Sequence, residues 1–220
     1  MSVTVNVIGA GLAGCEAAWR LAQEGINVRL YEMKPEKFSP AHKYGGFAEL
    51  VCSNSLKAAR LESAAGLLKY EMEHLGSLTV PCAKENSVEA GGALAVDREK
   101  FSDSVTAKIR SHPLIEVVGG EVTALPDGIV IIATGPLTSG AMADTIKQLC
   151  GEGLSFYDAA APIVTYESLD LDKVFFASRY DRGDADYINC PMNKEEYLAF
   201  HEALVNAERV QLKDFETHPF

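Results

Sequence analysis

Val3-Thr4-Val5-Asn6-Val7-Ile8 leads directly into Gly9-Ala10-Gly11-Leu12-Ala13-Gly14, and this stretch decides the fold. The first six residues are mostly β-branched, which predicts a buried strand. Apolar residues at helical spacing after the turn predict a helix that ends at Gly25. Residues 27–31 then predict a second strand, which ends at Glu32. The opening of the chain therefore predicts a βαβ unit with a GxGxxG pattern at its first turn.

Each glycine of this pattern has a physical reason. Gly9 permits a tight turn, Gly11 lets the backbone approach a pyrophosphate, and Gly14 lets the helix pack closely on the strand. The helix N-terminus offers N–H groups to phosphates, and Glu32 can accept hydrogen bonds from an adenosine ribose. Because a carboxylate repels a ribose 2′-phosphate, FAD or NAD is expected rather than NADP. The predicted cofactor-binding residues are Gly9, Ala10, Gly11, Leu12, Ala13, Gly14 and Glu32. A glycine-rich turn that binds nothing is the alternative.

A second small-residue turn, Ala133-Thr134-Gly135, ends a predicted buried strand that begins at Gly128. A strand ending in this way, well after GxGxxG, resembles flavoproteins of the glutathione-reductase kind, which favours FAD and adds Thr134 and Gly135 to the cofactor-binding residues. The expected fold class is α/β, a Rossmann-like FAD/NAD(P)-binding fold with an inserted smaller α+β domain. We expect residues 1–150 to form the FAD-binding domain and residues 151–220 to begin the inserted one.

The sequence between these two turns predicts further elements. Residues 33–55 show little periodicity and are expected to form a long functional loop. A helix is expected from about residue 56 to Gly76, and another after Asp97 as N-cap, with Phe101, Val105 and Ile109 on one face. Short strands are expected at 115–118 and 121–125.

Charge is distributed unevenly along the 220 residues, whose 20 basic and 31 acidic side chains give a formal net charge of −11. Residues 1–110 hold 13 of each sign, so residues 111–220, with 7 basic and 18 acidic, carry the whole excess. Bulk attraction to nucleic acid is therefore not expected from the second half. Five cysteines without a CxxC pair are typical of a reduced cytoplasmic protein and predict no metal site. No apolar run is long enough for a membrane span, and the start of the chain lacks the pattern of a signal peptide.

The segment Phe47-Ala48-Glu49-Leu50-Val51-Cys52-Ser53-Asn54-Ser55-Leu56 resembles a sequence specific to the folate- and FAD-dependent tRNA (uracil-5-)-methyltransferase family. Further segments support the resemblance: GAGLAG (9–14), GGALAVDREKFS (91–102), ATGPLTS (133–139), FYDAAAPI (156–163), SRYDRG (178–183) and FHEALVNAE (200–208). The similarity runs from Val7 to about residue 216. A related family that modifies the tRNA wobble uridine shares GxGxxG but lacks the segment 47–56.

This resemblance implies an enzyme that uses 5,10-methylenetetrahydrofolate as one-carbon donor and NAD(P)H to reduce a bound FAD. It implies transfer of the carbon to C5 of a T-loop uridine in tRNA, giving 5-methyluridine. Family members continue well past residue 220 and carry a second functional cysteine there, so the chain resembles the front half of a longer enzyme. Two positions depart from the family pattern: Tyr44-Gly45-Gly46 stands where polar, often Asp-containing residues are usual, and Cys190 replaces a small residue without a thiol.

Cys52 is the candidate catalytic residue. C5 of uracil is a poor nucleophile until a group adds at C6, and a thiolate suits that addition. A helix start at Ser53, Asn54 or Ser55 would lower the pKa of the neighbouring thiol modestly. The resemblance implies a covalent role for Cys52, either on uracil or in protecting the one-carbon unit carried by the flavin. A small buried core residue is the alternative.

Other polar residues are weaker candidates. His42 could face the flavin or the substrate, or be solvated, and Asp97-Arg98-Glu99 could support the cofactor or simply start a helix. The acidic group Asp181, Asp184 and Asp186 is expected to be a solvated turn rather than a metal site. Two rival functions stay open, namely an NAD(P)H:flavin oxidoreductase without an RNA substrate and an inactive FAD-binding fragment. Ribosomal RNA is an alternative target to tRNA.

Overall fold

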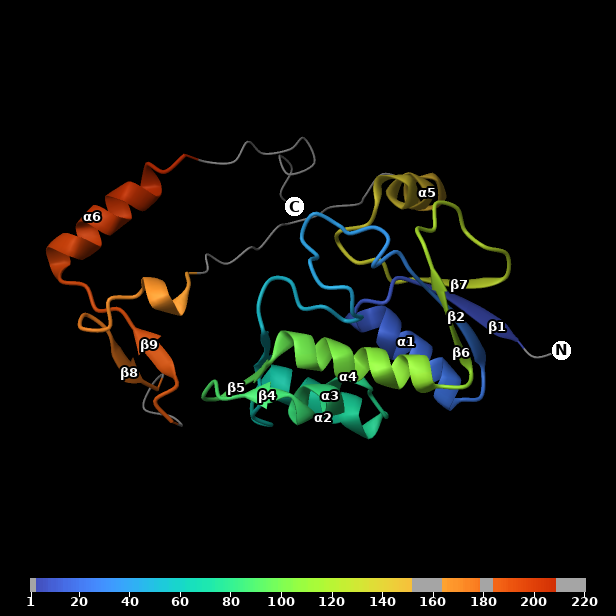
Figure 1. Ribbon diagram of the computed structural model, residues 1–220, viewed down its shortest axis with the longest axis horizontal. Coiled ribbons are helices and arrows are strands. Elements are labelled where there is room, and N and C mark those ends of the chain that lie inside the picture. The colour runs from blue at the N-terminus through green and yellow to red at the C-terminus, as the bar shows by residue number, and fades with distance from the viewer. Residues whose placement is uncertain (1–2, 152–163, 179–183, 209–220) are drawn as a thin grey trace. The chain divides into compact units, whose positions relative to one another are not determined.

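A computed structural model describes the protein over residues 3–151, 164–178 and 184–208 (Figure 1). The chain divides into two compact units, of which the first comprises Met1–Val88 with Ala93–Leu154 and the second Glu89–Gly92 with Ser155–Phe220. Some sequence features that we singled out lie outside the described residues: 156–163, Asp181 and most of 178–183.

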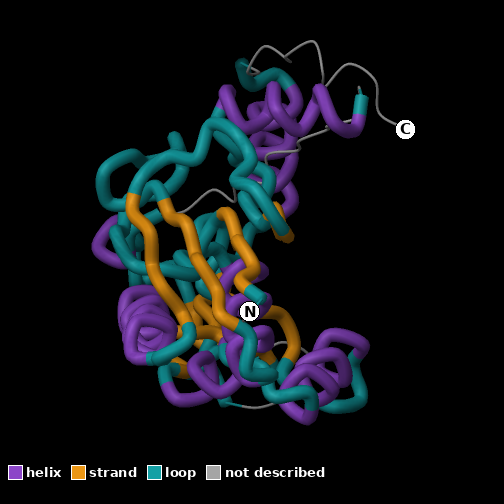
Figure 2. Tube along the Cα trace, turned by 90° about the vertical axis from the view of Figure 1, so that its right-hand side faces the viewer, coloured by secondary structure: helices purple, strands orange, loops and turns teal. Residues whose placement is uncertain are grey.

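A parallel four-stranded sheet forms the centre of the first unit, with its strands side by side in Figure 2. Its strands and main covering helices are β1 (Thr4–Ile8), α1 (Leu12–Gln23), β2 (Asn27–Glu32), α4 (Arg98–Ser111), β6 (Ile115–Gly119) and β7 (Ile129–Ile132). The strand order is β6-β2-β1-β7, and all neighbouring pairs are parallel. The order therefore reverses at β1, which leaves a crevice at the carboxyl ends of β1, β2 and β7. This arrangement confirms the Rossmann-like α/β fold predicted from the sequence.

The core of the first unit lies between the sheet and the helices α1 and α4, which pack on each other and on the sheet. The predicted stripe Phe101, Val105 and Ile109 is fully buried, which confirms the face of α4. Burial of a large apolar side chain contributes about 1.5–3 kcal/mol. The strand β7 is less buried than expected, because it has one neighbouring strand among the described residues and Ile129 is 57% exposed.

The chain between β2 and α4 forms a small antiparallel sheet and two helices. These elements are β3 (Ser55–Ala58), α2 (Ala64–His74), α3 (Thr79–Glu85), β4 (Ser87–Val88) and β5 (Ala93–Val96), with the sheet order β3-β5-β4. The expected helix from residue 56 onward is wrong at its start, because β3 pairs with the distant β5 and α2 begins only after its N-cap Ser63. The segment 33–54 contains neither helix nor strand, as expected of a long loop.

Two other elements differ from the sequence expectation. Residues 121–125 form no strand, because Gly120, directly after β6, has φ +110°, which lies outside the extended conformation of a strand. The helix α5 (Gly140–Cys150) was not expected, since the apolar pattern weakens after Pro136. None of the helices in the described ranges is long and apolar enough to cross a membrane.

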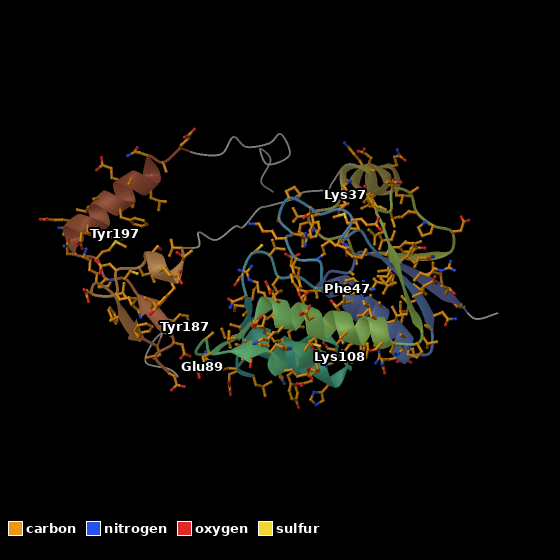
Figure 3. The ribbon with its side chains drawn as sticks, in the orientation of Figure 1. Lys37, Phe47, Glu89, Lys108, Tyr187 and Tyr197 are labelled. Carbon is orange, nitrogen blue, oxygen red and sulfur yellow. The ribbon has the colours of Figure 1, made fainter. Side chains whose placement is uncertain are left out.

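The second unit is built from a hairpin and a helix. Its elements are the 3₁₀ turn η1 (Tyr166–Ser168), β8 (Phe175–Ala177), β9 (Tyr187–Asn189) and α6 (Lys194–Val205). The strands β8 and β9 pair antiparallel. The hydroxyl of Tyr187 donates to the carbonyl of Ala90 at 3.0 Å, and Figure 3 labels Tyr187 beside Glu89. The turn 89–92 is therefore part of this unit rather than of the first.

Candidate dinucleotide site and the loop before Cys52

The turn after β1 has room for a side chain at only one of its three glycines. Gly9 has φ +98°, and a Cβ there would lie 2.7 Å from the carbonyl oxygen of Ala133. A Cβ at Gly14 would lie 1.7 Å from the carbonyl oxygen of Gly9, so α1 packs directly on the turn. At Gly11 a Cβ would meet no described heavy atom within 4 Å. Gly9 and Gly14 are thus required by packing, whereas Gly11 has open space beside it.

The N-terminus of α1 faces this open space. Gly11 is the N-cap residue, no side chain of the described residues caps the helix, and the first turn from Leu12 contains no acidic residue. The N–H groups of the first turn, including those of Leu12 and Ala13, have no partner within a helix. Together with the helix dipole, these groups form a region suited to a phosphate.

Glu32 is buried at the end of β2 and contacts the turn directly. Its Oε2 accepts a hydrogen bond from the N–H of Ala10 at 2.8 Å, and its Oε1 accepts one from the N–H of Lys34 at 2.9 Å. Each carboxylate oxygen can accept more than one hydrogen bond. Glu32 therefore orients the glycine-rich turn and can still accept hydrogen bonds from ribose hydroxyls.

A pocket lies at the carboxyl ends of β1, β2 and β7, as the strand order predicts. Its lining includes Gly9, Glu32 and Thr134, so three residues predicted from separate parts of the sequence lie together. The hydroxyls of Thr134 and Thr138 lie 2.6 Å apart, and Gly135 has φ +68°, which glycine adopts readily. Both turns named in the sequence analysis thus border one pocket.

His42 also lines this pocket and is half-buried. Its Nδ1 lies 2.5 Å from the hydroxyl of Ser39. Burial and the positive charge of Lys34 lower the pKa of His42 below its ordinary value. These effects favour the neutral form of the imidazole, which can donate or accept a hydrogen bond in the pocket.

Lys34 and Glu49 are the functional candidates that the sequence reasoning missed. The ammonium of Lys34, nearly buried, lies 3.1 Å from the Glu49 carboxylate and donates to the carbonyls of Tyr44 at 3.1 Å and Gly46 at 2.6 Å. Glu49 also accepts from the N–H groups of Lys43 and Tyr44. Partial burial alone would raise the pKa of Glu49, but these N–H groups and Lys34 lower it overall. The position of Lys34 just after a strand does not by itself indicate that its ammonium holds this loop.

The loop that leads to Cys52 is hydrogen-bonded both to the glycine-rich turn 9–14 and to α4. The N–H of Ala48 donates to the carbonyl of Ala10 at 2.8 Å. The N–H of Phe47 donates to the Thr106 hydroxyl of α4 at 2.8 Å, and Figure 3 shows Phe47 beside this helix. Arg98 donates to the carbonyl of Leu50 at 3.2 Å. The loop is therefore held at several points.

The segment Asp97-Arg98-Glu99 has a structural role at the start of α4. Asp97 is the N-cap and accepts from the N–H of Lys100 at 3.1 Å, which confirms the expected cap. Arg98 contacts the loop before Cys52, and among the described residues that line the pocket none belongs to this segment.

The departure from the family pattern at Tyr44-Gly45-Gly46 has a local explanation. The hydroxyl of Tyr44 donates to Asp103 of α4 at 2.6 Å, and this bond raises the pKa of Tyr44 to about 12. A Cβ at Gly46 would lie 2.4 Å from the hydroxyl oxygen of Ser102 and 2.8 Å from the Tyr44 ring. The tyrosine and the glycine therefore fit each other against α4.

Cys52 is exposed in an irregular segment between this loop and β3. The expected helix start next to Cys52 is wrong, because residues 55–58 form the strand β3 and α2 begins only after Ser63. Exposure also excludes the alternative that Cys52 is a buried core residue. Within the described part of the chain, the residues that line the pocket do not include Cys52.

The remaining cysteines and acidic residues give no second site. Cys15 is buried, its thiol donates to the carbonyl of Ala10 at 3.3 Å, and burial raises its pKa strongly. Asp186 accepts a hydrogen bond from the N–H of Gly91 at 2.6 Å. Across the described ranges, no three His, Cys, Asp or Glu side chains are grouped as metal ligands.

The fold and the geometry of the turn define a Rossmann-like protein of the dinucleotide-binding class. The chain belongs to the family described as glucose inhibited division protein A, whose sequence pattern matches residues 4–220.

Curated relatives are similar over almost the whole chain. Those from Pelotomaculum thermopropionicum, Bacillus licheniformis and Bacillus subtilis are 61%, 59% and 59% identical and cover 97%, 100% and 99% of this chain. Each is named methylenetetrahydrofolate–tRNA-(uracil-5-)-methyltransferase TrmFO, which confirms the resemblance seen in the segment 47–56. The matches cover 49%, 51% and 50% of those proteins, so the chain spans about half the length of the curated relatives it matches.

Similarity to solved structures is much lower. The open form of NikD, an amino acid oxidase essential for nikkomycin biosynthesis, is 14% identical with a TM-score of 0.38, over 62% of this chain and 53% of that chain.

Proposed function

We propose that this chain binds FAD and belongs to an enzyme that transfers a one-carbon unit from 5,10-methylenetetrahydrofolate to C5 of a T-loop uridine in tRNA, with NAD(P)H as reductant. The name shared by relatives of 59–61% identity supports this proposal. In it, residues 1–150 form the FAD-binding domain and residues 151–220 begin the inserted domain.

The residues of the pocket fit an FAD dinucleotide. The open space at Gly11 and the uncapped N-terminus of α1 suit a pyrophosphate, which the turn Gly9, Ala10, Gly11, Leu12, Ala13 and Gly14 would hold. Glu32 would accept hydrogen bonds from the ribose, while Thr134, which lines the pocket with Glu32, and its neighbour Gly135 would border the dinucleotide from the other side. When bound, FAD supplies the redox chemistry that the reaction needs.

One observation carries the proposal. Ala48, four residues before Cys52, donates its N–H to Ala10 of the dinucleotide turn at 2.8 Å. The segment that bears the candidate catalytic thiol is thereby attached to the turn that would hold the cofactor. A cofactor site and a nucleophile joined in this way suit a reaction in which both act on one substrate.

We assign the covalent role to Cys52, whose exposure leaves it accessible to a base of an RNA. Addition of its thiolate to C6 of uracil would raise the electron density at C5, which must attack the one-carbon unit. Protection of the carbon carried by the cofactor is the other form of this role. The neutral imidazole of His42 in the pocket could exchange a proton with a bound ligand.

The test is mass analysis of tRNA from cells that lack the gene. We expect 5-methyluridine to be lost, to return with the unchanged gene, and not to return with Cys52→Ala, although that variant still binds FAD. An unchanged 5-methyluridine content without the gene would reject the proposal. Oxidation of NAD(P)H by the purified protein, independent of folate and tRNA, would favour a simple oxidoreductase instead.

A further inference from the structure

Two non-glycine residues with left-handed backbone lie on either side of Cys52, namely Ala48 with φ +50° and Lys57 with φ +65°. This conformation costs about 1–2 kcal/mol for a residue with a Cβ. Ala48 is buried and its N–H contacts Ala10, so the fold explains its conformation. Lys57 is exposed on β3, and its backbone N–H donates to the hydroxyl of Ser55 at 3.1 Å, so a local turn accompanies its left-handed conformation.

The strain at Lys57 coincides with an irregularity of the small sheet. The pairing of β3 with β5 shifts its register between Ser55 and Ala58, and Lys57 lies inside this interval. Irregularities of this kind change the direction of a side chain and are frequent beside functional sites. Lys57 follows Cys52 by five residues, so the two Cα atoms are at most about 17 Å apart along the chain.

Two further cations accompany Lys57. The ammonium of Lys69 on α2 is held by the carbonyls of Ala58 at 2.9 Å and Ala65 at 2.8 Å. Ala58 is the neighbour of Lys57 on β3, so the Lys69 ammonium lies beside the strand that carries Lys57. Burial and the charge of Lys57 lower the pKa of Lys69. Arg60 is exposed two residues after β3 ends.

The charges of Lys57 and Arg60 are not neutralised locally. Neither has a carboxylate oxygen within 4.0 Å among the described residues. Several other lysines and arginines of the first unit do form ion pairs: Arg29, Lys37, Lys84, Lys100 and Lys108. The group formed by Lys57, Arg60 and Lys69, which we name the basic surface, therefore has no ion-paired carboxylate among the described residues, and its first member follows Cys52 by five residues.

We propose that the basic surface binds backbone phosphates of the RNA whose uridine reaches Cys52; this inference rests on the proposed function. Lysine and arginine side chains on phosphates supply most of the affinity of RNA and DNA complexes. Tyr70, half-exposed and next to Lys69 in the sequence, lines an adjoining pocket with Lys69, and its ring packs against that of His74 with the centroids 4.1 Å apart. Because the first 110 residues have no net charge, such a surface must be local.

The experiment measures binding of the 220-residue chain to a fluorescein-labelled T-arm stem-loop RNA by anisotropy over a series of KCl concentrations. We expect Lys57→Gly and Arg60→Ala each to weaken binding about 3- to 10-fold and to reduce the slope of log Kd against log[KCl] by about one. Glycine adopts φ +65° freely, so Lys57→Gly should melt at a temperature no lower than the unchanged chain. If Lys57→Gly is as stable as the unchanged chain but binds RNA more weakly, the lysine acts in RNA binding rather than in stability.

Lys194→Ala is the matched control, because Lys194 is a lysine of α6 with no ion-pair partner among the described residues. The RNA affinity of Lys194→Ala and its slope of log Kd against log[KCl] should equal those of the unchanged chain. Equal losses for Lys194→Ala and Lys57→Gly, or unchanged binding by Lys57→Gly and Arg60→Ala, would overturn the inference. Displacement of the RNA by poly-L-glutamate as effectively as by unlabelled RNA would assign the surface to an acidic protein instead. No binding by the unchanged chain would also overturn it, while the cellular 5-methyluridine analysis would still decide the proposed function.

Discussion

Lys34 and Glu49 form a buried ion pair of 3.1 Å, with side chains 5% and 11% exposed, between the end of β2 and the loop before Cys52. The main-chain N–H of Lys34 binds Glu32, and its ammonium holds the carbonyls of Tyr44 and Gly46. One residue thus contacts both the candidate ribose carboxylate and the loop that leads to the candidate nucleophile. Because buried charges need partners, each member of the pair depends on the other.

Removal of one member of this pair should cost more than removal of both. Lys34→Met leaves the Glu49 carboxylate without its cation, and Glu49→Leu leaves the ammonium without its anion, so each should lower the free energy of unfolding by about 3–5 kcal/mol. The double variant Lys34→Met/Glu49→Leu should lose less than the sum of the two, because no charge is then left unpaired. Urea denaturation followed by circular dichroism measures all three. Additive losses would show that the two side chains are not coupled.

The stability contributed by Glu49 should depend on pH. The pKa of Glu49 is lowered in the folded state, so the unfolded chain binds the proton more readily as the pH falls. The contribution is therefore complete above the ordinary carboxyl pKa of about 4.3 and is lost as the pH falls through the lower folded value. Glu49→Gln cannot titrate. The difference in unfolding free energy between the unchanged chain and Glu49→Gln should shrink from about pH 6 to about pH 3; a difference independent of pH would contradict this account.

Alanine at two glycines of the turn should have opposite consequences. At Gly14 the added methyl group would meet the carbonyl oxygen of Gly9 at 1.7 Å, a contact between backbone elements that cannot relax cheaply. Gly14→Ala should therefore destabilise the fold by about 1–3 kcal/mol or more. At Gly11 the methyl group has space, so Gly11→Ala should fold normally but bind FAD more weakly, because the methyl group occupies space expected for the pyrophosphate.

Thermal denaturation and FAD titration separate these two outcomes. Gly11→Ala should keep the melting temperature of the unchanged chain and bind FAD more weakly. Gly14→Ala should have a lower melting temperature. If Gly11→Ala bound FAD as tightly as the unchanged chain, the pyrophosphate would not lie against this turn.

The extent to which the sequence predicted these features depends on the distance over which each interaction acts. The β1-α1-β2 unit and the Asp97 cap were predicted, because strand, turn and cap signals lie within a few residues of each other. The strand β3 was not, because its partner β5 places Ser55 opposite Ala95, forty positions along the chain. Polar Ser53, Asn54 and Ser55 suit a helix cap equally well, so only the tertiary partner selected the strand.

The candidate site was predicted unevenly for the same reason. The glycine pattern and Glu32 have fixed spacing, so the sequence predicted the glycine-rich turn, to which Glu32 is hydrogen-bonded through Ala10. Lys34 and Glu49 are fifteen residues apart within a loop without periodicity, and no local pattern indicates that they meet. The exposure of Cys52 also depends on contacts of the loop with α4 and with Ala10, which the sequence alone did not reveal.

The cysteines should differ widely in reactivity toward iodoacetamide in the native protein. Cys52, Cys150 and Cys190 are exposed, whereas Cys15 and Cys82 are buried. Alkylation requires a thiolate that the reagent can reach, and burial both blocks access to Cys15 and raises its pKa. We expect Cys15 to be labelled at least about a hundredfold more slowly than Cys52, because Cys15 must wait for local or global opening.

Peptide mass spectrometry over a time course measures each site separately, and labelling in urea should remove the difference. Equal rates for Cys15 and Cys52 in the native protein would mean that the packing of α1 on the turn does not protect the thiol, and the attachment of the Cys52 loop to Ala10 would then be in doubt as well.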